Sequence, residues 1–131
     1  MRKHSTGGFT LIELLIVVVV IGVLAVIAIP KLSGSRERAF RSAIVSDLKS
    51  LAHAQELYHT ANFSYAGDVT LLGSDGSEGV TISINESDQA GWAATATHQS
   101  VITGQCGVFH GQADATNADP ATAPGVVACS F

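Results

Sequence analysis

The sequence predicts an α+β fold in which one long amino-terminal helix packs on a small antiparallel sheet of three to four strands. Three observations support this prediction. An almost uncharged apolar run occupies residues 9–30, and an apolar stripe with helical spacing follows between Phe40 and Tyr58. From Val80 onward, short segments alternate apolar and polar residues, which is the pattern of strands.

Length and charge limit the classes of protein to which the chain can belong. With 131 residues it can form one small domain and a helix, but not two independent cores. The formal net charge is −4, and without residues 1–8 five Lys or Arg face eleven Asp or Glu, which gives −6. An acidic chain is poorly suited to neutralise phosphates, so a nucleic-acid partner has no positive support.

Residues 9–30 have the length and composition of a membrane-spanning helix. As a helix these 22 residues would be about 33 Å long, close to the thickness of a bilayer's hydrocarbon core. Arg2 and Lys3 favour a cytoplasmic amino terminus, although Lys31 and Arg36 on the other side weaken that prediction. A secretory signal peptide has a shorter apolar stretch and a small-residue cleavage site. A plain single-pass anchor is the more serious alternative.

Glu13 is the one charged residue of the apolar run and argues against a plain anchor. A carboxylate deep in an apolar helix costs about 2.5–3.5 kcal/mol on insertion scales, and such residues usually face a partner. Two interpretations stay open, an acid tolerated at the membrane interface and an acid that forms an intermolecular salt bridge in an assembly.

The segment Gly8-Phe9-Thr10-Leu11-Ile12-Glu13-Leu14 resembles the class III signal of type IV prepilins and of type II secretion pseudopilins. The resemblance is strongest over residues 1–65. It implies that a prepilin peptidase cleaves after Gly8 and that Phe9 is then N-methylated. It also implies that Glu13 neutralises the amino terminus of a neighbouring subunit. The physics agrees, because cleavage creates an ammonium group about one helical turn from that carboxylate.

Two residues of the apolar run match positions where the helix of this family is weakened. Pro30 lacks a backbone donor and clashes with the preceding turn, and Gly22 lowers helix propensity by about 1 kcal/mol relative to Ala. The stretch between them is expected to extend or melt when subunits move from lipid into a filament. The alternative for Gly22 is close packing between helices.

The carboxyl-terminal part is expected to hold the sheet. We predict strands at Val80–Ile84, Trp92–His98, Gln105–His110 and Val126–Ser130, a turn at Glu86–Gln89, and loops at 60–79 and 111–125. Cys106 and Cys129 form a disulfide if this part is exported, and buried free thiols if it stays in the cytosol. Pilins commonly close a carboxyl-terminal loop with such a disulfide.

No catalytic constellation is found, so we expect neither an enzyme nor a cofactor. Acidic residues of the loops form a calcium site in major pseudopilins, but no EF-hand spacing is present here and we predict no metal. The candidate acids are Asp68, Asp75, Glu78, Glu86 and Asp88.

The resemblance implies a structural subunit of a type IV pilus, held in the inner membrane as a precursor and then polymerised with itself into an extracellular filament for adhesion, motility or DNA uptake. Its implied partners are the prepilin peptidase, the pilus assembly platform and the secretin. A type II secretion pseudopilin, a minor pilin and a membrane-anchored binding module that never polymerises are the alternatives. The expected parts are a leader peptide (1–8), a transmembrane and filament-core helix (9–30), an amphipathic helix half (31–60), a connecting loop (61–79), and the sheet with its disulfide loop (80–131).

Overall fold

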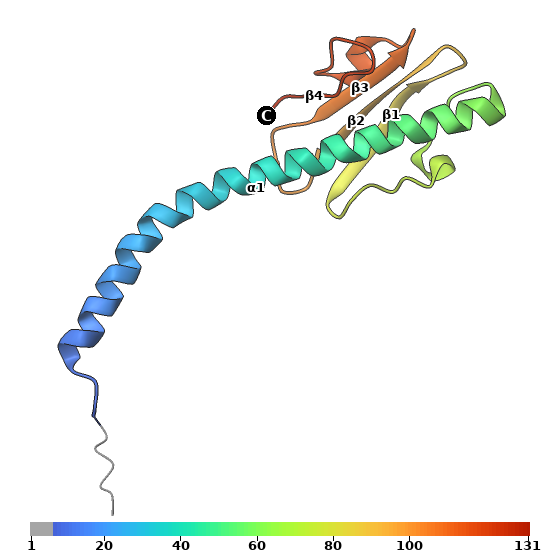
Figure 1. The fold of residues 1–131 in the computed structure, drawn as a ribbon. Coiled ribbons are helices and arrows are strands. Elements are labelled where there is room, and N and C mark those ends of the chain that lie inside the picture. Colours follow the sequence, from blue (N-terminus) through green and yellow to red (C-terminus); the bar gives the residue numbers. More distant parts are fainter. Residues whose placement is uncertain (1–6) are drawn as a thin grey trace, which may run out of the picture. The chain divides into compact units, whose positions relative to one another are not determined.

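The computed structural model describes residues 7–131, apart from the side chain of Lys31. Most of the predicted leader, with Arg2 and Lys3, lies outside this range. A long helix is followed by four strands, and two short 3-10 helices lie in the connections (Figure 1). The elements are α1 (Leu11–Asn62), η1 (Val69–Leu72), β1 (Val80–Ser87), β2 (Gly91–His98), β3 (Cys106–Gly111), η2 (Ala115–Ala118) and β4 (Ala128–Cys129). The predicted α+β fold is confirmed.

The chain divides into two units, one that ends at Arg36 and a carboxyl-terminal unit, Glu37–Phe131. The apolar stripe of α1 lies in the second unit and forms one wall of its core. Ile44, Leu48 and Leu51 are fully buried there, as the helical spacing predicts. The helix ends at Asn62, two residues beyond the predicted end, because Phe63 takes a left-handed conformation with φ of 56°.

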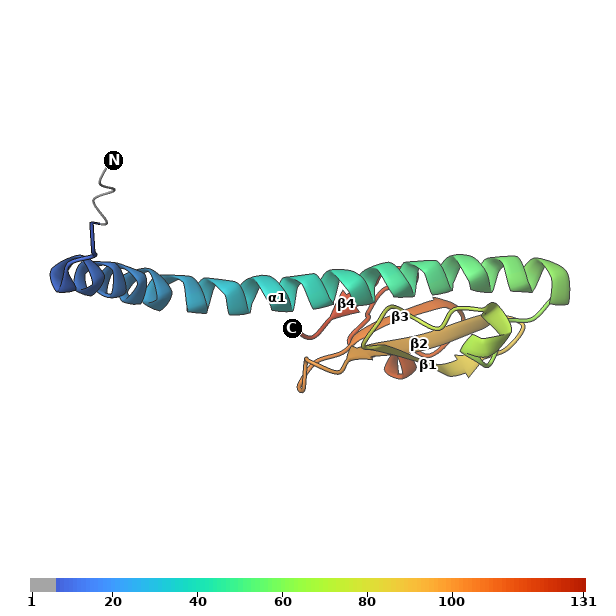
Figure 2. The ribbon, with the colours of Figure 1, turned by 90° about the horizontal axis from the view of Figure 1, so that it is seen from below.

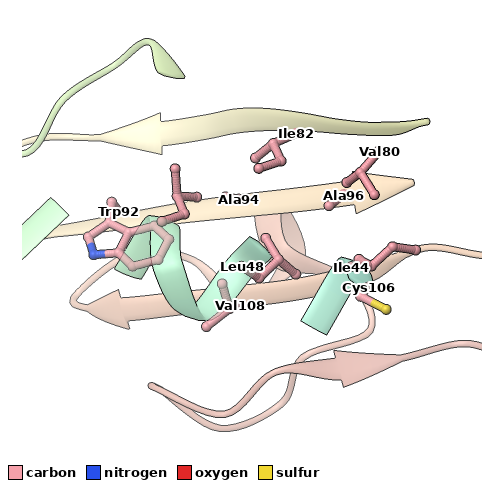
Figure 3. Packing of buried hydrophobic residues seen from close by; sticks show 10 residues of the cluster. Ile44, Leu48, Val80, Ile82, Trp92, Ala94, Ala96, Cys106 and Val108 are labelled. Carbon is pink, nitrogen blue, oxygen red and sulfur yellow. The ribbon is translucent and has the colours of Figure 1, made fainter. Parts of the chain in front are cut away.

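The four strands form an antiparallel meander in the order β1-β2-β3-β4. One face of this sheet packs on the buried stripe of α1 (Figure 3). Trp92 is the largest fully buried side chain of this core, and Val80, Ile82 and Val108 pack in the same cluster. Alternation along each strand directs these residues to one face.

Strand bounds differ from the predicted ones, most clearly in β1. This strand continues to Ser87, and the predicted turn at Glu86–Gln89 is therefore wrong in its first half. The reason is a β-bulge, since the pairing with β2 shifts register between Ile84 and Glu86. Extra residues interrupt the alternation at a bulge, so the pattern appears to end before the strand does. β4 is only two residues long, shorter than predicted.

The second face of the sheet is covered by the segment between β3 and β4, which the sequence predicts as an exposed loop. Ala113, Ala118 and Ala121 are buried there against Ala93 and Phe109. The prediction of an exposed loop is therefore wrong for these alanines, because a two-sided sheet needs apolar cover on both faces.

Cys106 and Cys129 are paired across β3 and β4 and form a disulfide with a sequence separation of 23 residues. Cys106 is fully buried in the core beside α1. The disulfide therefore ties the last segment of the chain to a central part of the sheet.

Candidate functional site

The candidate site lies where the chain enters α1. Gly8 precedes the helix and is exposed, and an added Cβ atom would meet nothing within 4 Å in the described part of the chain. Its backbone is not in the left-handed region that favours glycine. Nothing in the fold of residues 7–131 therefore requires glycine at this position. Phe9 follows with 87% of its surface exposed, although it is a large apolar side chain.

Thr10 and Glu13 form a capping box at the start of α1. The Thr10 backbone N–H and hydroxyl both donate to Glu13 Oε2 at 2.8 Å, and the Glu13 N–H donates to Thr10 Oγ1 at 3.3 Å. These bonds satisfy groups that a helix start leaves without partners. This role was not among the predictions from the sequence, although a Thr followed three residues later by Glu before an apolar run is its known signal.

Only one of the two Glu13 carboxylate oxygens is used in the capping box. Both Thr10 donors reach Oε2, which leaves Oε1 without a hydrogen-bond donor among residues 7–131. This carboxylate can therefore cap its own helix and still accept a hydrogen bond from another molecule.

The apolar residues after Glu13 are exposed all around the helix. The segment is long and apolar enough to cross a membrane by length and composition, and none of it is buried by other described parts of the chain. α1 is continuous through Gly22 and Pro30. At Gly22 an added Cβ would meet nothing within 4 Å, so no close packing within the described chain requires this glycine.

Three of the five loop acids considered for a calcium site, Asp68, Glu86 and Asp88, have hydrogen-bond partners within the fold. Asp68 accepts hydrogen bonds from the backbone N–H and hydroxyl of Thr70, and these bonds lower the pKa of its carboxyl group. Glu86 and Asp88 accept hydrogen bonds from backbone N–H groups. Among residues 7–131, no group of three His, Cys, Asp or Glu side chains is arranged to hold a metal ion.

A surface cluster that was not predicted from the sequence joins the end of α1 to β3. Glu56 Oε1 lies 3.6 Å from His110 Nε2 and accepts a hydrogen bond from the Tyr65 hydroxyl at 3.3 Å. Tyr65 also stacks on His59, with ring centroids 4.4 Å apart. Burial, and then the charge of Glu56, raise the pKa of Tyr65. His110 is far in sequence from Glu56, His59 and Tyr65, so no local pattern indicates that the four side chains meet.

One residue of the charged face of α1 also has a structural partner. Asp47 accepts hydrogen bonds from the backbone N–H and the hydroxyl of Ser77, at 2.7 and 2.8 Å. It holds the connection between η1 and β1 against the helix. Asp47 therefore has a structural role in the fold.

Comparison with known proteins finds a match over the same region of the chain. Residues 3–29 match the family model described as the prokaryotic N-terminal methylation motif. The matched stretch includes the start of α1. It covers the capping box and the exposed apolar segment.

The type IV wide pilus major component PilA4 of Thermus thermophilus aligns with almost the whole chain. The two are 32% identical over 130 residues, and the alignment covers 92% of this chain and 99% of that protein. The chain belongs to the type IV pilin-like family.

Type II secretion system core protein G aligns over the amino-terminal half. The protein from Klebsiella michiganensis is 40% identical over 65 residues, and that from Escherichia coli is 43% identical over 58 residues. These alignments cover 50% and 44% of this chain, and 46% and 40% of the two relatives. The chain thus spans less than half the length of these relatives in the alignments.

Proposed function

We propose that the chain is a structural subunit of a type IV pilus. It is cleaved by a prepilin peptidase after Gly8, N-methylated at Phe9, and polymerised through α1 into an extracellular filament. The observation that carries the choice of a pilus is the extent of similarity. Similarity to the major component of a wide pilus extends over the carboxyl-terminal unit, whereas similarity to the secretion proteins stops after 58–65 residues.

The exposed apolar segment explains why such a subunit needs two environments. Its side chains gain roughly 25 cal/mol for each Å² that leaves water, so it is stored in the inner membrane and later buried between copies of itself. The assembly platform and the secretin are the implied machinery for this transfer.

Glu13 is proposed to join subunits through its free oxygen. Cleavage after Gly8 converts the Phe9 nitrogen into an ammonium group, and Oε1 of a neighbouring copy is available to accept from it. A buried carboxylate is stable only when paired and hydrogen-bonded, and the capping box together with this ammonium would supply both. The stretch between Gly22 and Pro30 is proposed to extend during assembly.

The test is to express the chain in a host with a prepilin peptidase, shear off surface fibres and determine the amino-terminal mass. We expect sedimentable fibres whose subunits begin with methylated Phe9. Gly8→Val should abolish processing, because cleavage is proposed to follow Gly8, whereas Gly7→Ala should not. Both glycines have open space around them, so neither substitution disturbs the fold of the described residues. A chain that keeps residues 1–8 and stays in the membrane would refute the proposal in favour of a plain anchor.

Glu13→Ala separates polymerisation from anchoring. We expect normal insertion and processing but loss of fibres, because the neighbour's ammonium loses its partner. Thr10→Ser keeps the capping donors and is the matched control. Unchanged fibre yield from Glu13→Ala would refute the salt bridge between subunits, whereas a chain that forms no fibres even without the substitution would favour a membrane-anchored binding module.

A type II secretion pseudopilin is the second candidate, supported by the 40% identity of the amino-terminal half to protein G. Fibre length decides between the two. Long surface fibres support the pilus, whereas short fibres that form only together with a secretion system support the pseudopilus.

A further inference from the structure

A groove of about 310 Å³ lies between the last turns of α1 and η1. Its walls are largely apolar, with Leu57 and Tyr58 from α1 and Leu71 and Leu72 from η1. Leu57 and Leu71 are 59% and 58% exposed, which is unusual for leucines that face each other across a groove. Apolar surface that is gathered in this way commonly marks a site of contact with another molecule.

An isolated apolar side chain protrudes elsewhere on the same unit. Ile102 lies in the turn between β2 and β3 and is 95% exposed. The turn itself is anchored, because the Val101 N–H donates to the His98 carbonyl at 2.8 Å and the His98 ring stacks on Phe40. Ile102 therefore projects into solvent from a turn that is fixed by these contacts.

The groove and Ile102 lie at opposite ends of the unit Glu37–Phe131. Phe40 marks the end that carries Ile102, and Tyr58, which lines the groove, is 18 residues further along α1, or about 27 Å. Figure 2 shows the β2–β3 turn in orange and η1 in yellow-green at the two ends. The two features can meet only between copies, and a head-to-tail contact of this kind propagates into rings or filaments.

Positive charge is also distributed unevenly between the two ends of this unit. The chain after Lys49 contains no Lys or Arg but eight Asp or Glu. Arg38 and Arg41 flank Phe40 at the Ile102 end, and neither forms an ion pair with any residue of the described chain. Asp68 caps η1 beside the groove. Glu37 and Glu78 also lie towards the Ile102 end, but the residues around the groove include no Lys or Arg, because the chain after Lys49 contains none.

We propose that Ile102 of one copy inserts into the groove between Leu57 and Leu71 of a second copy, so that successive subunits of the filament contact each other head to tail. This inference rests on the proposed function, because it assumes that the chain polymerises. Ile102 and the nearby arginines lie at one end of the unit, and the groove and Asp68 lie at the other. Because each feature has its complement at the other end of the same chain, a second copy is favoured over an unrelated partner.

The test is cross-linking within sheared fibres of the full-length chain that carries Ile102→Cys and Leu71→Cys together. Each subunit would then have both halves of the contact, so oxidation should produce a ladder of covalent multimers, with a disulfide between positions 71 and 102. Each single variant should stay monomeric. The matched control is Ile102→Cys with Val126→Cys, since Val126 is 55% exposed. Fibres without a ladder, or dimers from Ile102→Cys alone, would overturn the head-to-tail contact.

A charge at position 102 provides an independent measurement. Ile102→Asp should weaken each contact by on the order of 10-fold or more and reduce fibre yield, because an isoleucine no longer enters the groove. Val126→Asp should leave the yield unchanged. Equal yields from both variants would refute the inference while the proposed function stands. Absence of fibres from the unmodified chain would instead refute the proposed function.

Discussion

Gln55 is the polar residue within the buried stripe of α1, and its replacement tests how the helix holds the connecting loop. Its side chain is fully buried, and its amide donates to the Ala66 carbonyl at 2.9 Å and accepts from the Ala66 N–H at 2.8 Å. Ala66 is itself 1% exposed. In Gln55→Leu both backbone groups lose their partner in a buried place.

The expected loss of stability follows from these two bonds. An unsatisfied buried N–H or C=O costs about 1–3 kcal/mol, and the leucine regains part of this by apolar burial. We therefore expect Gln55→Leu to lower the free energy of unfolding by roughly 2–4 kcal/mol, out of a total of about 5–15 kcal/mol.

The assay is guanidinium unfolding of the full-length chain in detergent micelles, followed by fluorescence of Trp92. This residue is the single tryptophan of the chain and is 1% exposed in the core, so its emission reports the carboxyl-terminal unit. Gln112→Leu is the matched control, because that glutamine is exposed. A loss below about 0.5 kcal/mol, the range usual for surface substitutions, would show that water replaces the two bonds and that the reasoning is wrong.

Three further predictions use the same assay. Gly107→Ala should lower the free energy of unfolding by about 1–3 kcal/mol, because its Cβ would overlap the carbonyl oxygen of Ala118 in the covering segment; an unchanged midpoint would contradict this close approach. Cys106→Ser combined with Cys129→Ser should cost about 3 kcal/mol on the chain-entropy model for a loop of 23 residues, and a reducing agent should reproduce the loss in the unmodified chain. Hydrogen bonds from the backbone and then the side chain of Thr116 lower the pKa of Asp114, so its stabilising contribution is present above the ordinary pKa and is lost as the pH falls through the lowered one. Asp114→Ala should accordingly reduce the acid dependence of the unfolding midpoint, and an identical pH profile would refute that role.

Local patterns alone were enough to predict the main elements. The apolar run that contains Glu13 and the apolar stripe from Phe40 to Tyr58 each extend over several helical turns, so they can be recognised as helical without knowledge of distant partners. The four strands follow from alternation, which a pleated backbone imposes on any sheet with a buried face. The capping box of Thr10 and Glu13 is equally local and was within reach of the sequence.

Only the tertiary structure decided which polar and small residues serve the core. Whether Gln55 meets solvent or Ala66 depends on where the chain returns after the helix, eleven residues later. The alanines between β3 and β4 are too small to produce an apolar pattern, and they become buried only because the sheet has a second face to cover. The placement of Ile102 and the groove at opposite ends likewise depends on the sheet's register against α1, which is set by contacts between residues distant in sequence. A periodic pattern reflects the surroundings of residues that are close in sequence. These features instead depend on contacts between residues that are far apart in sequence.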